Sequence, residues 1–78
     1  MTITERVQRI IDDVIFNKTT AEDLDKTWED LGIDSLDLID VLRNVEDEFS
    51  ITLEYNVFKD SKILTVNDLI NYLEKQPL

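Results

Sequence analysis

Apolar residues recur at the spacing of an α-helix in three separate segments of this chain. The first segment covers about residues 3–15, and Thr2 and Glu5 at its start have the spacing of a capping box. The second covers about residues 35–49, and the third begins after Thr65, which forms a second capping-box pair with Asp68. Amphipathic helices bury their apolar faces against one another, so the pattern predicts a helical bundle. The predicted core positions are Ile3, Val7, Ile10, Ile11 and Val14, then Leu38, Val41, Leu42, Val45 and Phe49, then Val66, Leu69, Ile70 and Leu73.

The chain length and the connections between these helices complete the fold prediction. With 78 residues there is room for one core, so we expect a single domain over residues 1–78. Residues 17–34 form a long first loop of a kind that is often functional, and Leu24, Trp28 and Leu31 should hold it against the core. Residues 50–64 should form a short helix or an irregular segment, because a lone strand there would have no partner. The predicted fold class is all-α, a small bundle of three to four helices with a long first loop.

Acidic residues are concentrated in the middle of the chain. Between Glu22 and Glu48, eleven Asp and Glu residues stand against Lys26 and Arg43, which gives a net charge of −9 out of −10 for the whole chain. Nucleic-acid phosphates would be repelled by this segment, so we expect no nucleic-acid partner. It favours basic protein partners, whose encounter is accelerated by charge steering. A solvated acidic face without a partner is the plain alternative.

Composition also excludes several kinds of site. The N-terminal residues lack the long apolar core of a signal peptide or membrane span, so we expect no membrane insertion and a cytoplasmic protein. The chain has no cysteine, which excludes disulfides, thiolate nucleophiles and zinc–thiolate sites. The segment from Asp23 to Lys26 begins like a calcium-binding EF-hand loop but lacks the required glycine and final glutamate. We therefore expect no metal site.

Ser35 stands at the head of the second helix, three residues after Gly32, which is the only glycine. Serine often does no more than cap a helix. Here Asp34 can be the cap, with Asp37 three residues further on, and Ser35 then occupies the first helical position with a free hydroxyl. The chain has no histidine, and no lysine lies near Ser35 in the sequence, so the hydroxyl has no base to activate it. We therefore expect Ser35 to be a substrate for another protein, and the chain not to be an enzyme.

A second surface of the same helix lies off the core-facing arc. On a helical wheel Leu36, Ile39 and Arg43 fall together, away from the core positions, and carboxylates border them. Single surface aliphatic residues are normal, but this pair lies beside Ser35. We predict that this surface contacts partner proteins through Leu36, Asp37, Ile39, Asp40, Arg43, Glu46 and Asp47.

Residues 31–40, LGIDSLDLID, resemble the modification site of the acyl carrier protein family, in which Asp-Ser-Leu follows Leu-Gly-x. The resemblance covers nearly the whole chain. It includes Trp28 shortly before Leu-Gly, an acidic second helix that ends in Glu-Asp-Glu-Phe, and a last helix that is introduced by Thr65 and carries Tyr72. One departure is Arg43, which stands where the family often has an aliphatic residue or methionine.

This resemblance implies a function. Ser35 would receive 4′-phosphopantetheine from coenzyme A through a separate, magnesium-using phosphopantetheinyl transferase, and Asp34 would be the neighbouring carboxylate used during the transfer. Acyl intermediates would be held on the arm as thioesters and presented to basic-surfaced acyl-transferring or synthase enzymes of fatty-acid, polyketide or related biosynthesis. We expect the carrier to be a monomer. Two alternatives remain, an aminoacyl or peptidyl carrier of a nonribosomal-peptide or lipid-modifying pathway, and an acidic adaptor that is never modified.

Overall fold

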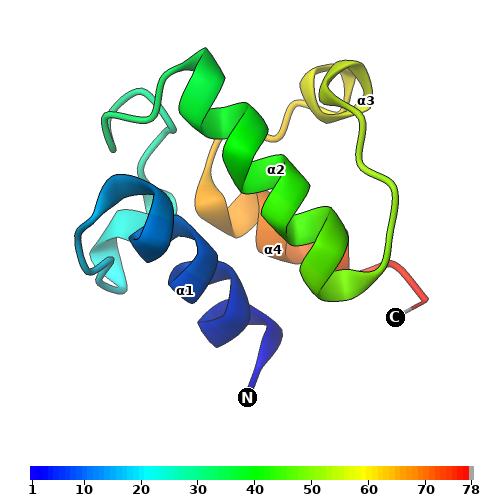
Figure 1. Ribbon diagram of the computed structural model, residues 1–78, viewed down its shortest axis with the longest axis horizontal. Coiled ribbons are helices and arrows are strands. Elements are labelled where there is room, and N and C mark those ends of the chain that lie inside the picture. Colours follow the sequence, from blue (N-terminus) through cyan, green and yellow to red (C-terminus); the bar gives the residue numbers. More distant parts are fainter. Residues whose placement is uncertain (78) are drawn as a thin grey trace.

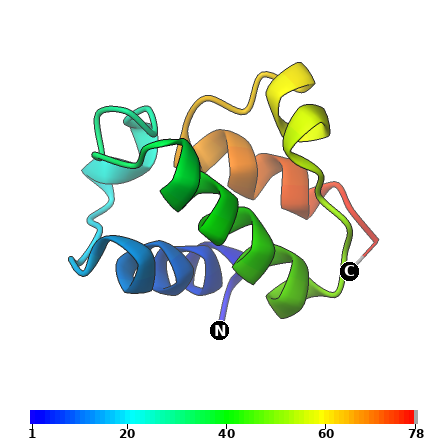
Figure 2. The ribbon, with the colours of Figure 1, turned by 45° about the horizontal axis from the view of Figure 1, so that its top comes forward.

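The computed structural model describes residues 1–77, which form α-helices joined by loops and one short 3₁₀-helix. The elements are α1 (Ile3–Ile15), the 3₁₀-helix η1 (Glu22–Asp25), α2 (Ser35–Phe49), α3 (Tyr55–Asp60) and α4 (Val66–Glu74). The longer helices α1, α2 and α4 pack together, and α3 lies at one edge of the bundle (Figures 1 and 2). The all-α prediction is confirmed, as are the predicted bounds of the first two helices. For residues 50–64 we expected a short helix or an irregular segment, and the short helix α3 lies there.

Side-chain caps begin three of these helices at the predicted residues. Thr2 and Glu5 form a complete capping box at α1, and Thr65 does the same with Asp68 at α4. Asp34 caps α2. By contrast, α3 has no side-chain cap, and its six residues are too few for a helix that is stable by itself. Its formation therefore depends on tertiary packing.

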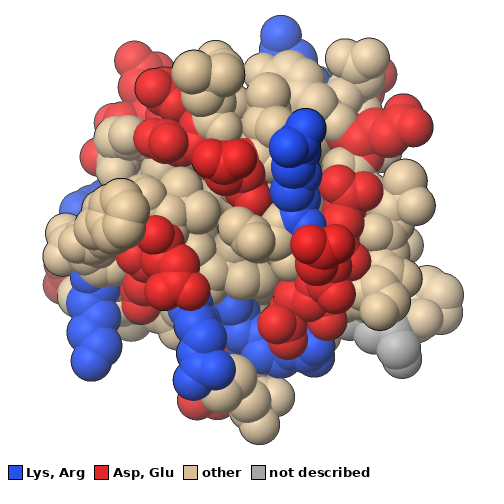
Figure 3. Space-filling model, viewed as in Figure 1, with Lys and Arg blue, Asp and Glu red and all other residues tan. Residues whose placement is uncertain are grey.

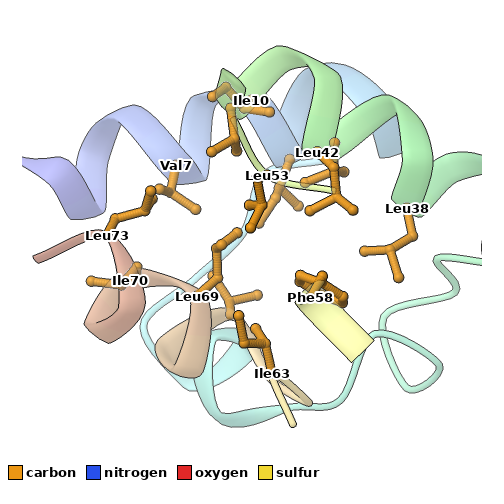
Figure 4. Close-up of a cluster of buried hydrophobic side chains, with 14 of the residues drawn as sticks. Val7, Ile10, Leu38, Leu42, Leu53, Phe58, Ile63, Leu69, Ile70 and Leu73 are labelled. Carbon is orange, nitrogen blue, oxygen red and sulfur yellow. The ribbon is translucent and has the colours of Figure 1, made fainter. Parts of the chain in front are cut away.

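The core is built from the three longer helices and is closed by residues of the connections (Figure 4). Helix α1 packs against both α2 and α4. Every core position predicted on α2 and α4 is buried, whereas Ile3 and Val14 of α1 are only partly buried. From segment 50–64, Leu53, Phe58 and Ile63 point into the same core, and each is less than 5% exposed. The apolar side of α3 is thus part of the core.

Trp28 fastens the long first loop to the connection between α3 and α4. Its indole N–H donates a hydrogen bond of 3.0 Å to the backbone oxygen of Ile63. Its ring packs against Phe58 with the ring centroids 5.8 Å apart. Leu24 and Leu31 are half-buried against the core. The prediction that these three side chains hold the loop in place is confirmed.

Arg6 joins α1 to the C-terminal end of α2. Its Nε donates to Glu48 Oε2 at 2.7 Å, and its Nη2 donates to the backbone oxygen of Glu48 at 2.9 Å. The guanidinium also lies 4.3 Å from the ring centroid of Phe49. Backbone oxygens in the last turn of a helix lack partners within the helix, so Arg6 satisfies one of them as it pairs with the carboxylate. This end of α2 is therefore tied to α1.

Two helices end at non-glycine residues in the left-handed backbone region. Phe16 follows α1 with φ 55° and ψ 38°, and Ser50 follows α2 with φ 55° and ψ 44°. A side chain in this region brings Cβ close to the following carbonyl oxygen, which costs about 1–2 kcal/mol per residue. Glycine avoids this contact and is the usual residue at such helix ends.

We expect Phe16→Gly to be more stable than Phe16→Ala by about 1 kcal/mol in the free energy of unfolding. The ring of Phe16 is 94% exposed, so either replacement loses little apolar burial. The alanine variant removes the ring but keeps Cβ, and it therefore isolates the backbone effect. Urea denaturation followed by circular dichroism measures the difference. A glycine variant no more stable than the alanine variant would contradict the prediction.

Candidate functional site

Ser35 is the first residue of α2, and its side chain is exposed. Asp34 caps the helix, because its Oδ1 accepts a hydrogen bond of 2.9 Å from the backbone N–H of Asp37. None of the hydrogen bonds found within residues 1–77 uses the Ser35 hydroxyl. The prediction that Asp34 is the cap is confirmed, and the Ser35 hydroxyl is exposed without a hydrogen bond to residues 1–77.

Gly32 sets up this position through its backbone. Its φ is 77°, and a Cβ added there would meet no atom within 4 Å. Glycine is therefore favoured at this position by the backbone conformation and not by a lack of space for a side chain. The N–H of Gly32 donates to Glu29 O, and the N–H of Ile33 donates to Trp28 O, both at 2.9 Å. This tight turn places Ile33 in the core while Asp34 and Ser35 face solvent. The lone glycine therefore lets the loop reverse just before α2.

An open groove of about 480 Å³ lies beside Ser35. Its walls come from the first loop, α2, α3 and the connection to α4, which are far apart in the sequence. Large apolar and aromatic side chains form most of its lining, namely Trp28, Ile33, Leu38, Tyr55 and Leu64. From the sequence, Trp28 was expected to hold the first loop against the core and not to line a groove. The groove itself was missed because helical periodicity carries no information on how these four segments meet.

The predicted partner-contact residues lie along the outer side of α2. Leu36 is 75% exposed, and Asp40, Arg43 and Asp47 are also exposed. The other three, Asp37, Ile39 and Glu46, are half-buried.

Two of these half-buried residues lie beside the segment that follows α2. Ile39 stands outside the core but lines a smaller hollow of about 240 Å³ between α2 and the segment that follows it. Glu46 Oε2 accepts a hydrogen bond of 3.2 Å from the N–H of Leu53. Glu46 therefore has a structural role that the helical wheel does not show.

The chain is similar to known proteins over nearly its full length. Residues 3–73 match a family model described as a phosphopantetheine attachment site. An acyl carrier protein of Streptococcus pneumoniae is 37% identical over 76 residues, which is 97% of either chain. One from Streptococcus pyogenes is 36% identical over the same length and coverage. One from Lactococcus lactis subsp. cremoris is 34% identical over 74 residues, which cover 95% of this chain and 96% of its own.

This chain belongs to the acyl carrier protein family. The resemblance drawn from LGIDSLDLID is thereby confirmed, and so is the prediction that the chain is a carrier and not a catalyst. The prosthetic group of the family is covalently attached 4′-phosphopantetheine, and its members work with a phosphopantetheinyl transferase and with synthase enzymes.

The N-terminal end of α2 is suited to a phosphate ester. Backbone N–H groups in the first turn of a helix lack partners within the helix, and the helix dipole places partial positive charge there. Phosphate groups therefore bind readily at helix N-termini. The exposed Ser35 hydroxyl lies at that end of α2 and has open space beside it. The residues that are present fit the group.

Apart from Glu48, the carboxylates on α2 have no ion-pair partners within residues 1–77. Two salt bridges occur within residues 1–77. Arg6–Glu48 lies at the C-terminal end of α2, and Lys26–Asp23 joins η1 to the residue that follows it. The hydrogen bond from Lys26 lowers the pKa of the Asp23 carboxyl, and the Thr20 amide lowers that pKa further. No such pairing neutralises the acids between Asp34 and Asp47. The acidic surface along α2 is therefore open to a basic partner.

Residues 1–77 also contain no group of three or more side chains placed to hold a metal ion. Within the same residues, every helix is too short or too polar to cross a bilayer.

Proposed function

We propose that this chain carries acyl groups on a 4′-phosphopantetheine arm attached to Ser35, in fatty-acid, polyketide or related biosynthesis. One observation carries the assignment of the site: the Ser35 hydroxyl is exposed at the start of α2 and is not needed for capping. A transferase could therefore use this oxygen without breaking a contact of the fold. When bound, the arm supplies a terminal thiol that holds the acyl group as a thioester.

Asp34 has a second role in this proposal. Its Oδ1 accepts the N–H of Asp37, while none of the hydrogen bonds found within residues 1–77 uses its Oδ2. The residue is exposed, so the second oxygen can face a transferase that approaches Ser35. Asp34 thus holds the start of α2 in place and offers a carboxylate beside the reacting hydroxyl.

The groove beside Ser35 supports an acyl cargo. Its lining is dominated by side chains such as Trp28, Leu38 and Leu64, which offer apolar surface to a hydrocarbon chain. Each Å² of apolar surface that leaves water contributes about 25 cal/mol, so even partial burial of a chain favours this location. We therefore propose that hydrocarbon-like acyl chains are its cargo.

Partner enzymes would dock on the outer side of α2. The exposed Leu36 beside Ser35 offers an apolar contact, and the unpaired acids along the helix attract a basic surface. Charge steering speeds such an encounter, and a small contact area lets the carrier leave quickly. A monomeric carrier suits this exchange. Its monomeric state and cytoplasmic location stay predictions.

Intact mass spectrometry separates a carrier from an unmodified adaptor. The purified chain is incubated with coenzyme A, magnesium and a broad-specificity phosphopantetheinyl transferase. A carrier gains the mass of one phosphopantetheine group, whereas an adaptor keeps its mass. A parallel sample without coenzyme A controls for other additions. An unchanged mass, together with loading of a known carrier in the same mixture, would contradict the proposal.

A further inference from the structure

Arg43 is the one Lys or Arg residue of α2, and it is exposed. Figure 3 shows acidic side chains on either side of a basic one over the middle of this helix. Asp40 lies three residues before Arg43 and Asp47 four residues after it, which are spacings that allow ion pairs on a helix surface. Neither acid pairs with it, because both salt bridges within residues 1–77 lie elsewhere. The guanidinium is thus a free cation among acids.

Glu46 lies three residues after Arg43, but its carboxylate binds a backbone N–H instead. Its half-buried carboxylate accepts the hydrogen bond from the N–H of Leu53 and so holds the connection to α3 against α2. The remaining acids around Arg43 belong to exposed side chains in water, where an ion pair contributes little because water and salt screen it. Arg43 therefore keeps its hydrogen-bond donors available for an incoming group.

Apolar surface adjoins this cation. Arg43 lines the hollow of about 240 Å³ together with Ile39, Leu42 and Tyr55, and Glu54 belongs to the same lining. Ile39 and Tyr55 are both half-buried, so part of each side chain remains open to contact. The hollow therefore offers some apolar surface beside one positive charge, and Glu46 and Glu54 bring carboxylates to the same lining.

We infer that Arg43 binds a carboxylate of the partner protein, and that the partner's docking surface carries this one acid within a ring of basic residues beside an apolar side chain. This inference rests on the proposed function, because it describes the enzymes that would read the carrier. The surface required of the partner is the charge inverse of the carrier's own. Arginine suits this role because its planar guanidinium can hold a carboxylate through two parallel hydrogen bonds.

Charge complementarity favours a protein over other anionic ligands. A nucleic acid or an anionic lipid surface presents many negative charges, and Asp40, Asp47 and Glu54 would repel them. A single carboxylate among basic residues avoids this repulsion. The carboxylate pairs with Arg43, and the basic residues around it face the acids of this chain. A wholly basic docking surface would place a cation against Arg43 and would be disfavoured, so Arg43 distinguishes between partner enzymes.

Two synthetic helical peptides test this inference. They share the same leucine anchors and flanking lysines and differ at one central position, which is Glu in the first and Lys in the second. Their dissociation constants are measured on the unmodified chain by amide chemical shifts at about 0.15 M salt, where charges more than about 8 Å apart are largely screened. Wild type is compared with Arg43→Glu. Lys18→Glu is the matched control, because it makes the same change of net charge at an exposed residue of the loop that follows α1.

The readout is the dissociation constant of the Lys peptide divided by that of the Glu peptide. We expect this ratio to be at least about fivefold lower for Arg43→Glu than for wild type. A change of about fivefold is the upper end of what a direct ion pair on a protein surface contributes. Lys18→Glu should leave the ratio unchanged. Equal ratios for wild type and Arg43→Glu would overturn the inference. So would failure of both peptides to shift the amide signals of Ile39, Arg43 and Tyr55. Ser35 is unmodified throughout, so failure of pantetheinylation is a separate result.

Discussion

Ser35→Ala will abolish loading of the 4′-phosphopantetheine arm while the fold stays intact. The substitution removes the only oxygen that the proposed phosphate ester can use. The Ser35 hydroxyl makes no hydrogen bond within residues 1–77, and Asp34 caps α2 without it. Alanine is also a good residue at an exposed helical position. We therefore expect the free energy of unfolding to change by no more than about 0.5 kcal/mol.

Intact mass after incubation with coenzyme A and the transferase measures loading, and circular dichroism with urea measures stability. Ser61→Ala is the matched control, since Ser61 is also an exposed serine at a helix end but lies after α3. This control should load as wild type does. Loading that persists in Ser35→Ala would show that the arm is attached elsewhere. Loss of helicity in that variant would show that Ser35 supports the fold.

Leu42→Ala will destabilise the carrier by about 2–5 kcal/mol, because it opens a cavity in the core. Leu42 is 3% exposed and lies beside Leu53 in the cluster of buried side chains (Figure 4). For a domain of this size, each kcal/mol lowers the melting temperature by about 4–8 °C, so the variant will be partly or wholly unfolded on modest warming. Thermal and urea denaturation measure the loss.

Ile39→Ala is the matched comparison, since it truncates an aliphatic side chain one turn earlier on the same helix. Ile39 is half-buried and stands outside the core cluster. Its loss should change the free energy of unfolding by no more than about 1 kcal/mol. Transfer reactions with partner enzymes should nevertheless slow, because Ile39 lines the hollow beside Arg43. Equal destabilisation by the two variants would mean that Ile39 belongs to the core.

The two ends of α2 are held in different ways, and this difference bears on the carrier function. At the C-terminal end, Arg6 binds both the side chain and the backbone oxygen of Glu48. At the N-terminal end, the Gly32 turn brings the chain out to the surface, and Ser35 makes no side-chain contact that a modification would break. With the proposed arm on Ser35, α2 could therefore present it to an enzyme while its other end stays fixed to α1.

Local sequence determined much of this molecule. The caps at Thr2, Asp34 and Thr65 act on backbone groups three residues away, and helical periodicity repeats within a single segment. Interactions of such short range can be inferred from the residues themselves. For this reason the bounds of α1 and α2, the core face of α2 and the free hydroxyl of Ser35 were all predictable.

Tertiary structure decided the rest. Helix α3 lacks a side-chain cap and forms where Phe58 enters the core, so segment 50–64 had no local signal strong enough to define it. The contact between Trp28 and Ile63 joins residues 35 positions apart, and the groove beside Ser35 exists only because four segments meet there. Glu46 likewise binds Leu53 across a turn of the chain. Such contacts depend on how the helices pack, because their partners are brought together by burial of the shared core and not by spacing along the chain.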